Sequence, residues 1–487
     1  MIRTGEQYLD EISDGRIVWL GSEKIISVAT TPAFLQGARA FAALYDQASA
    51  AAHRQLFYAM PGDGGEAHEP EFRAFLPCKD SRDLALKHKL HASWSEASFG
   101  FLGRTPDYIA AAMSGFVTTP EAFRGDTFDG RSNLQSLHLR AKTMNLFVAF
   151  TLTNIKRDRS KPLSEQDKVE PDIGIHAVRE SDAGIFVSGV KAIGTAAIYS
   201  DEIIVGSIEP LHPSDVAYAL TFCIPPAAPG VSLISRASYS ASAGAEDAPL
   251  SSALDENDAI LVMKDVFVPW DHVLTYRDTR STFGIWWNTP AYASMGHQAS
   301  IRFYKKLEFL TGLAYLVLRS SGSLTIPEVR GSLGRLVGYA QLARSIAMGA
   351  ELEYESDPEG TGHIAPNRRA TYAQRLFASE VYPKFIHELR MFCGGSLIYL
   401  PANLSDFNAP EIGEILKSYF GTPEVEPVDR ARLLKLVWDV TSTEFGSRHA
   451  HYEQFYQGAP HVYLWQLAEQ GRLEELGRIA TNALSKN

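Results

Sequence analysis

The chain has 487 residues, of which 45% are hydrophobic and 21% are charged, a composition typical of a globular protein with room for about three domains. Its net charge of −11 at pH 7 argues against nucleic acid or an anionic membrane as the main partner and favours small molecules or proteins. The amino terminus has no apolar core of signal-peptide length, and no run approaches the ~20 apolar residues of a membrane span, so we expect a cytoplasmic protein.

The first third of the chain is predicted to be mostly helical. Apolar residues recur at three- and four-residue spacing in FLQGARAFAALYDQASA and in SRDLALKHKLHASWSEAS. We assign residues 1–145 to an N-terminal helical domain.

The segment FLGRTPDYIA predicts the start of a helix inside this domain. Thr105 is a good N-cap residue and Pro106 fits the first helical position. Arg104 then lies at the mouth of the helix, with Tyr108 close behind. A permanent cation, a phenol and free backbone N–H groups suit a bound anion. The alternative from spacing alone is that Arg104 hydrogen-bonds to a neighbouring loop.

From Leu146 the pattern changes to short β-rich runs separated by Gly, Pro and Asp, which predicts an antiparallel β domain over residues 146–275. Within it, SGVKAIGTAAIYSDEIIVG places glycines around Thr195, where the backbone could approach a flat ligand. A glycine-kinked hairpin explains the same spacing equally well.

Residues 276–487 return to the helical period in four long stretches, which favours a four-helix bundle. The last stretch is DRARLLKLVWDVTSTEFGSRHAHYEQFY. We therefore predict an α+β protein with the order helices, β domain, helical bundle.

Several residues of this last region are candidates for a site, each with an ordinary structural alternative. Gly394 and Gly395 could meet a pyrophosphate or could end a helix. Trp286 and Trp287 could line a pocket or anchor a subunit interface. The last candidates are three polar residues at helical spacing, a pattern that is typical of an exposed polar face: His297, Gln298 and Arg302.

Common cofactor and catalytic motifs are absent from the sequence. No GxGxxG opens a helix after a strand, and no Walker, GxSxG or HExxH motif occurs. The cysteines Cys78, Cys223 and Cys393 lie far apart, without metal-ligand spacing. We expect no Rossmann NAD site, no disulfide framework and no metal centre.

Nine ordered segments together resemble the two-component flavin-dependent aromatic monooxygenase family, typified by 4-hydroxyphenylacetate 3-monooxygenase (large oxygenase subunit) and chlorophenol monooxygenases. The resemblance covers almost the whole chain. It is carried by RTGEQYL, AALYD, FLGRTPDYIA, DRSK, GVKAIGT, VFVPWDHV, GHQASIRFYKKLEFL, CGGSLIYLP and LVWDVTSTEFGSRHAHYEQFY.

This resemblance implies an acyl-CoA-dehydrogenase-like fold that assembles as a homodimer or homotetramer. It also implies an oxygenase component that takes up FADH2 from a separate NAD(P)H:flavin reductase. Oxygen would add to the flavin to give a C4a-hydroperoxide, which hydroxylates an aromatic small molecule in a dry pocket.

The resemblance also implies roles for individual residues. Arg104 and Tyr108 would lie near the substrate oxygen and act in catalysis. Gly394 and Gly395 would flank the FAD phosphates. The remaining cofactor-binding residues would be Thr151, Thr195 near the flavin ring, and Gln298 and Arg302, which would reach FAD across a subunit interface.

One position departs from the family pattern. The histidine expected to bind the substrate falls on Phe150, and a phenylalanine can stack on a ring but cannot take a proton. We expect a substrate other than a simple phenol: an indole, an aminoaromatic compound or a phenol carried on a larger group. A phenol hydroxylase that works through Arg104 and Tyr108 alone is the alternative.

Two other functions compete with this one. A radical 4-hydroxybutyryl-CoA dehydratase would need an iron–sulfur cluster on three cysteines and a histidine, and no cysteine follows His297 within the next helical turns. A catalytically silent flavin-binding homologue would have had no reason to keep Arg104, Tyr108, Thr195 and the double glycine together.

Overall fold

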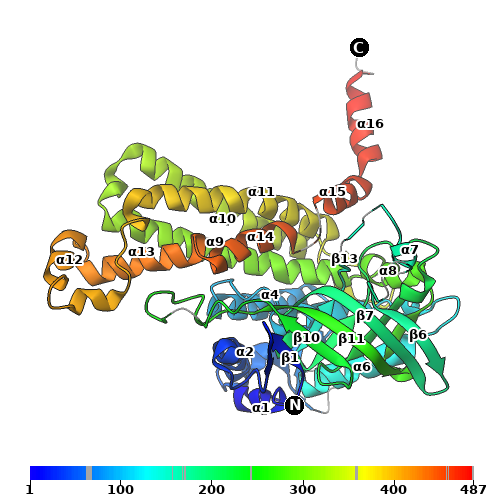
Figure 1. Cartoon of the computed structure of the whole chain (residues 1–487). Helices are drawn as coiled ribbons and strands as arrows, with labels where there is room; N and C mark the ends of the chain where they lie inside the picture. Colours follow the sequence, from blue (N-terminus) through cyan, green and yellow to red (C-terminus); the bar gives the residue numbers. More distant parts are fainter. Residues whose placement is uncertain are drawn as a thin grey trace.

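The computed structural model describes all residues except 62–68, 156, 159, 167, 169–171, 242–243, 357–359, 457, 459 and 485–487. Figure 1 shows helices of the first third and a twisted β region side by side, with a bundle of long helices across both. The expected order of helices, β region and bundle is confirmed. One continuous apolar core runs through all three parts, so residues from each of them can meet in one site.

The N-terminal part is built on helices that bury apolar faces against one another and against the bundle. Its main helices are α1 (Gly5–Glu11), α2 (Pro32–Ser49), α4 (Ser81–Ala97), α5 (Pro106–Phe116) and α6 (Arg131–Met144). Helix α5 begins at Pro106 as predicted, and all of its residues are buried. The Thr105 hydroxyl, however, bonds to the Asp107 carboxylate and leaves the backbone N–H groups uncapped. Arg104 therefore enters the interior at the head of a buried helix.

The β region consists of two main sheets. The six-stranded sheet has the order β2 (Glu23–Ile25), β1 (Val18–Leu20), β10 (Val231–Ser235), β11 (Asp258–Pro269), β7 (Gly184–Thr195) and β6 (His176–Ser181). The four-stranded sheet has the order β12 (Val273–Tyr276), β9 (Leu220–Ile224), β8 (Glu202–Val205) and β5 (Val148–Thr151). Two-stranded pairs join β3 (Tyr58–Ala59) to β4 (Glu71–Phe72) and β13 (Glu355–Ser356) to β14 (Ile364–Ala365).

Strand pairing in these sheets differs from the expected antiparallel pattern in two places. β1 pairs parallel to β10, and β5 pairs parallel to β8. β1 and β2 lie in the segment that was predicted to be helical. They were missed because strands of three residues are too short to show a period-two pattern. The parallel pairing of β5 with β8 brings Phe150 beside Ile204 and Thr151 beside Val205.

The bundle contains three long helices and a fourth position shared by two shorter ones. The long helices are α9 (Ala291–Ser320), α10 (Pro327–Leu352) and α11 (Arg368–Cys393). The expected single fourth helix is instead α13 (Pro427–Thr441) followed by α14 (Glu444–Phe455). The break follows from local chemistry, because the Thr443 hydroxyl accepts a hydrogen bond from the Gly446 N–H and starts a new helix.

Shorter helices surround this frame. They are α3 (Arg54–Phe57), α7 (Leu163–Gln166), α8 (Thr279–Trp287), α12 (Gly413–Phe420), α15 (Pro460–Glu469) and α16 (Leu473–Leu484). In Figure 1, α16 projects away from the rest of the chain. Along the described part of the chain, every helix is too short or too polar to cross a bilayer.

Candidate active site

Arg104 is a buried cation enclosed by aromatic rings. Its guanidinium lies 4.1 Å from the centre of the Tyr108 ring and 5.2 Å from that of Phe150. Tyr452 of α14 and Tyr456, which directly follows α14, stack on each other, and each ring centre lies 5.4 Å from the same guanidinium. We call these four rings the aromatic cage: Tyr108, Phe150, Tyr452 and Tyr456.

Hydrogen bonds fix the guanidinium inside the aromatic cage. Arg104 Nη1 donates to the Tyr452 hydroxyl, and Nη2 donates to the Tyr456 carbonyl, each over 3.0 Å. Burial alone would lower the pKa of Arg104, but the nearby phenols and the carboxylate of Glu256 raise it overall. Arg104 thus stays charged, and the prediction of a cation at the mouth of α5 is confirmed. The alternative predicted from spacing, a hydrogen bond from Arg104 to a neighbouring loop, is confirmed only in part. One partner of Arg104, Tyr452, lies in α14, and the other, Tyr456, directly follows that helix.

A buried carboxylate holds the backbone at this point. Glu256 Oε2 accepts the N–H groups of Gly103 and Arg104 over 2.7 and 2.8 Å, while its Oε1 binds Arg448. Arg448 also bridges to Asp258, whose Oδ1 accepts the Thr195 hydroxyl over 2.7 Å. Burial raises the pKa of Asp258, but Arg448 and the other partners outweigh it and lower the pKa well below its usual range. A chain of hydrogen bonds and ion pairs through Glu256, Arg448 and Asp258 therefore joins the Arg104 backbone to the Thr195 hydroxyl.

Five residues of this site were not predicted from the sequence: Glu256, Asp258, Arg448, Tyr452 and Tyr456. A signal was present for three of them, because residues 448, 452 and 456 recur every four positions and so share one helical face. The two carboxylates gave no comparable signal, since their role depends on contacts across the fold.

Three buried polar atoms on residues bordering the aromatic cage have no hydrogen-bond partner among the described residues. They are Thr151 Oγ1, Gln298 Oε1 and Trp286 Nε1. Trp286 packs on Phe150, with ring centres 6.2 Å apart, and Thr151 follows Phe150 in β5. Because unpartnered buried polar atoms are costly, these three atoms can take a polar ligand or an ordered water as partner.

Gln298 connects α9 to the head of α5. Its Nε2 donates to the Thr105 hydroxyl over 3.1 Å and lies 3.4 Å from Asp107 Oδ1. The other Asp107 oxygen bonds to His91 Nδ1 over 2.6 Å. The expectation of an exposed polar face is wrong, because each of its three residues is 1% exposed: His297, Gln298 and Arg302.

Arg302 lies inside the chain and not at a surface. Both of its terminal nitrogens bind Glu453 over 2.7 Å, and Lys306 binds the same carboxylate over 2.6 Å. Contact between Arg302 and FAD across a subunit interface stays a prediction, and this closed ion pair argues against it.

Gly394 and Gly395 lie exposed at the end of α11. Gly394 has a φ of +51°, and its N–H donates to the carbonyls of Arg390 and Met391, so the helix-ending role is confirmed. Among the described residues, no atom apart from those of adjoining residues lies within 4 Å of where a Cβ would stand on either glycine, so neither contacts the aromatic cage there. Their place beside FAD phosphates stays a prediction.

The two tryptophans are interior residues. Trp286 is fully buried against Phe116 and Phe150, and Trp287 is 8% exposed and donates to the Ile208 carbonyl. The subunit-anchor interpretation is therefore wrong for this pair, while Trp286 contacts the aromatic cage directly.

Comparison with known proteins decides the family. Residues 4–275 match the family model "4-hydroxyphenylacetate 3-hydroxylase N terminal", and residues 283–485 match its C-terminal counterpart. The chain belongs to the 4-hydroxyphenylacetate 3-hydroxylase family.

Three relatives match this chain over most of its length. The Escherichia coli 4-hydroxyphenylacetate 3-monooxygenase oxygenase component is 34% identical and covers 99% of this chain and 92% of its own length. The pyoverdin chromophore biosynthetic protein PvcC of Pseudomonas aeruginosa is 32% identical, covering 98% and 91%. A Streptomyces globisporus monooxygenase that acts on a carrier-protein-bound amino acid is 31% identical, covering 93% and 85%.

Solved structures of this family have the same fold as this chain. The HpaB oxygenase component of 4-hydroxyphenylacetate 3-monooxygenase complexed with FAD superposes with a TM-score of 0.91 at 26% identity, covering 99% of both chains. This match confirms the acyl-CoA-dehydrogenase-like fold. An archaeal 4-hydroxybutyryl-CoA dehydratase shares the fold, with a TM-score of 0.87 at 20% identity.

The described residues do not bring together the cysteines and histidine that would bind the iron–sulfur cluster of a dehydratase. Cys78, Cys223 and Cys393 are each buried and free. The group of potential metal ligands in the described residues contains His297 but no cysteine. The iron–sulfur interpretation is therefore not supported.

Proposed function

We propose that this chain is the oxygenase component of a two-component monooxygenase that uses FADH2 and O2 to hydroxylate an aromatic compound. The observation that carries the proposal is the permanent cation of Arg104 held inside the aromatic cage, in a chain whose relatives are oxygenase components. A separate NAD(P)H:flavin reductase supplies the reduced flavin.

The residues around the aromatic cage fit a flavin ring. An isoalloxazine offers several hydrogen-bond acceptors and one N–H donor along its polar edge. The unpartnered indole N–H of Trp286, hydroxyl of Thr151 and amide oxygen of Gln298 supply the complementary groups. Thr195 adjoins them, because a Cβ atom on its neighbour Gly194 would lie 4.0 Å from Thr151 Cβ. These four residues would hold the ring.

Reduced FAD, when bound, supplies the two electrons by which one atom of O2 enters the substrate while the other leaves as water. Arg104 holds a phenolate or another developing anion, because its guanidinium keeps its charge at every working pH. The Tyr108 hydroxyl, which makes no hydrogen bond among the described residues, is available to the substrate oxygen. The rings of the aromatic cage exclude water from the reacting atoms.

Phe150 narrows the class of substrate. Its ring packs against Tyr108 and Trp286, with ring centres 6.0 and 6.2 Å apart, and adds an apolar wall that supplies no proton acceptor. We propose an electron-rich ring that needs no base, such as an indole or aminoaromatic compound, or a phenol carried on a larger group.

A homodimer or homotetramer is part of the proposal. Gly394 and Gly395 are exposed at the end of α11, outside the aromatic cage of their own chain. They can serve FAD phosphates only when a second copy brings its flavin to that end of the bundle.

The function is tested by mixing the anaerobic protein and FADH2 with ¹⁸O2 in the presence of a panel of phenols, indoles and anilines. We expect the protein to change the time course of flavin oxidation and to place one ¹⁸O atom in a product. Flavin oxidation identical to that of free FADH2, without labelled product from any compound, would contradict the proposal.

We expect Thr151→Val to weaken FADH2 binding by about three- to tenfold, which corresponds to one net hydrogen bond. The same change removes an unpartnered hydroxyl, so the free protein should keep its melting temperature or gain slightly. Flavin titration and thermal melting measure the two effects.

Thr221→Val is the matched control for Thr151→Val. Thr221 is also a buried threonine with an unpartnered hydroxyl, but it lies two strands away in β9. Equal FADH2 affinity in wild type and Thr151→Val, or an equal loss in both variants, would remove Thr151 from the flavin site.

We expect Phe150→His to raise hydroxylation of 4-hydroxyphenylacetate by about tenfold or more, since a placed base contributes at least that much. The cation of Arg104, 5.2 Å from the present ring, would keep the new imidazole neutral and ready to accept a proton. Initial rates measure the gain, and Phe150→Leu, which removes the ring without adding a base, should show none. An unchanged rate in Phe150→His would mean that Arg104 and Tyr108 suffice for phenols.

A further inference from the structure

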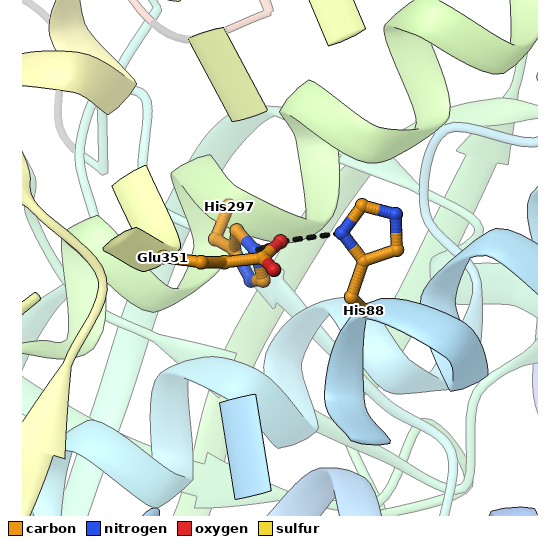
Figure 2. Close-up of side chains that lie close together, drawn as sticks. All are labelled: His88, His297 and Glu351. Carbon is orange, nitrogen blue, oxygen red and sulfur yellow. Dashed lines mark hydrogen bonds and ion pairs between the residues drawn. The ribbon is translucent and has the colours of Figure 1, made fainter. Parts of the chain in front are cut away.

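A second cluster of functional side chains lies outside the aromatic cage, between three helices. His88 comes from α4, His297 from α9 and Glu351 from the last turn of α10. Figure 2 shows the Glu351 carboxylate turned toward the His88 ring, with His297 behind it. More than 50 positions separate each of these residues from the next, so no sequence pattern connects them.

The two imidazoles converge on one oxygen atom. Glu351 Oε1 lies 2.7 Å from His297 Nε2 and also bonds to His88 Nδ1. All three ligand atoms lie within 4.8 Å of one another. Two imidazole nitrogens and a carboxylate oxygen around a common point are the donor set of His2Glu zinc centres.

The surroundings suit a metal ligand set. His88 Nε2 hydrogen-bonds to the Tyr304 hydroxyl over 2.8 Å, which orients the ring so that Nδ1 faces the cluster. The His297 side chain is 2% exposed, whereas those of His88 and Glu351 are 17% and 18% exposed. The cluster therefore has one closed side, built on α9, and one side through which an ion and a water ligand can enter.

We propose that His88, His297 and Glu351 bind one divalent transition-metal ion, with Zn²⁺ as the preferred occupant. Imidazole and carboxylate ligands suit Zn²⁺, and a water molecule from the open side completes four-coordination. At metal–ligand distances of about 2.0–2.2 Å, neighbouring ligand atoms stand about 3.3 Å apart. Glu351 must withdraw slightly from His297, which its place in the last turn of α10 allows.

Bound metal would connect the N-terminal helices to the bundle. It would tie α4 to α9 and α10 beside Gln298, which already bonds to the head of α5. Metal binding here does not presuppose the proposed oxygenase activity, and its expected effect is on metal content and thermal stability.

The test uses the full chain after removal of metal with a chelator. Calorimetric titration with ZnCl2 measures stoichiometry and affinity, Co²⁺ absorption reports the ligand geometry, and melting temperature reports stabilisation. His88→Gln removes one ligand while keeping a donor for Glu351. His53→Gln is the control, since His53 is an exposed histidine outside the cluster.

We expect one Zn²⁺ per chain in wild type and in His53→Gln, with a higher melting temperature when the ion is added. In His88→Gln, affinity should fall by about tenfold or more and the stabilisation should disappear. If His88→Gln does not fold, Glu351→Gln is judged by the same criterion. No Zn²⁺ binding in wild type, or unchanged binding in the folded cluster variant, would overturn the proposal.

Discussion

Arg104→Lys should lower the rate of aromatic hydroxylation by about 10²- to 10³-fold, the usual effect of removing one placed donor from a developing anion. Arg104 uses its two terminal nitrogens in different directions while its guanidinium packs on the Tyr108 ring. A lysine ammonium is a point charge on a flexible stem, so it cannot reproduce this fork. Burial would also lower the pKa of the lysine and favour its neutral form.

Single-turnover reactions with FADH2, O2 and substrate measure this prediction, with hydroxylated product and released peroxide counted separately. A loss of product with continued consumption of O2 would place the effect on the transfer of oxygen. Arg280→Lys is the control, because Arg280 is 82% exposed and pairs with Asp126 on the surface. Equal product yields from wild type and Arg104→Lys would contradict the assigned role.

Glu453→Gln should destabilise the protein by about 3–5 kcal/mol, the usual cost of breaking a buried ion pair by removing one partner. Burial raises the pKa of Glu453, but Arg302 and Lys306 outweigh it and hold the pKa at about 2. All three side chains are at most 1% exposed. Glutamine would leave two buried cations without a counter-charge. Loss of a proton from Lys306, whose pKa burial already lowers to about 8, would relieve only one of them.

Urea and thermal unfolding of Glu453→Gln measure the loss. The matched control is Glu308→Gln on α9, where Glu308 is 37% exposed and pairs with Lys305 over 3.1 Å. That variant should change the free energy of unfolding by no more than about 1 kcal/mol. Similar losses in both variants would mean that the buried pair contributes no more than a surface pair. The Glu453 position also matters for activity, because α14, which contains Glu453, carries Tyr452 of the aromatic cage.

Helix-start residues and helical periodicity in the sequence predicted much of the fold. Pro106 opens α5, and the helical periods of α9, α10 and α11 are continued in the structure over whole helices. The sequence missed features whose signals are short or non-local. Strands β1 and β2 have three residues each, and the junction of α13 with α14 depends on a cap that interrupts an otherwise helical pattern.

The sequence by itself determined the order of the parts, the family resemblance and the cation at the head of α5, because these depend on residues close together along the chain. Only the tertiary structure decided which groups surround that cation. Glu256 and Tyr452 reach Arg104 from 152 and 348 residues away, and Glu351 joins His88 across 263 residues. Periodicity reports which face of an element is buried, but not what packs against it. For that reason Arg302 could be predicted as a cofactor ligand from its motif, while its buried pairing with Glu453 became visible only in the folded chain.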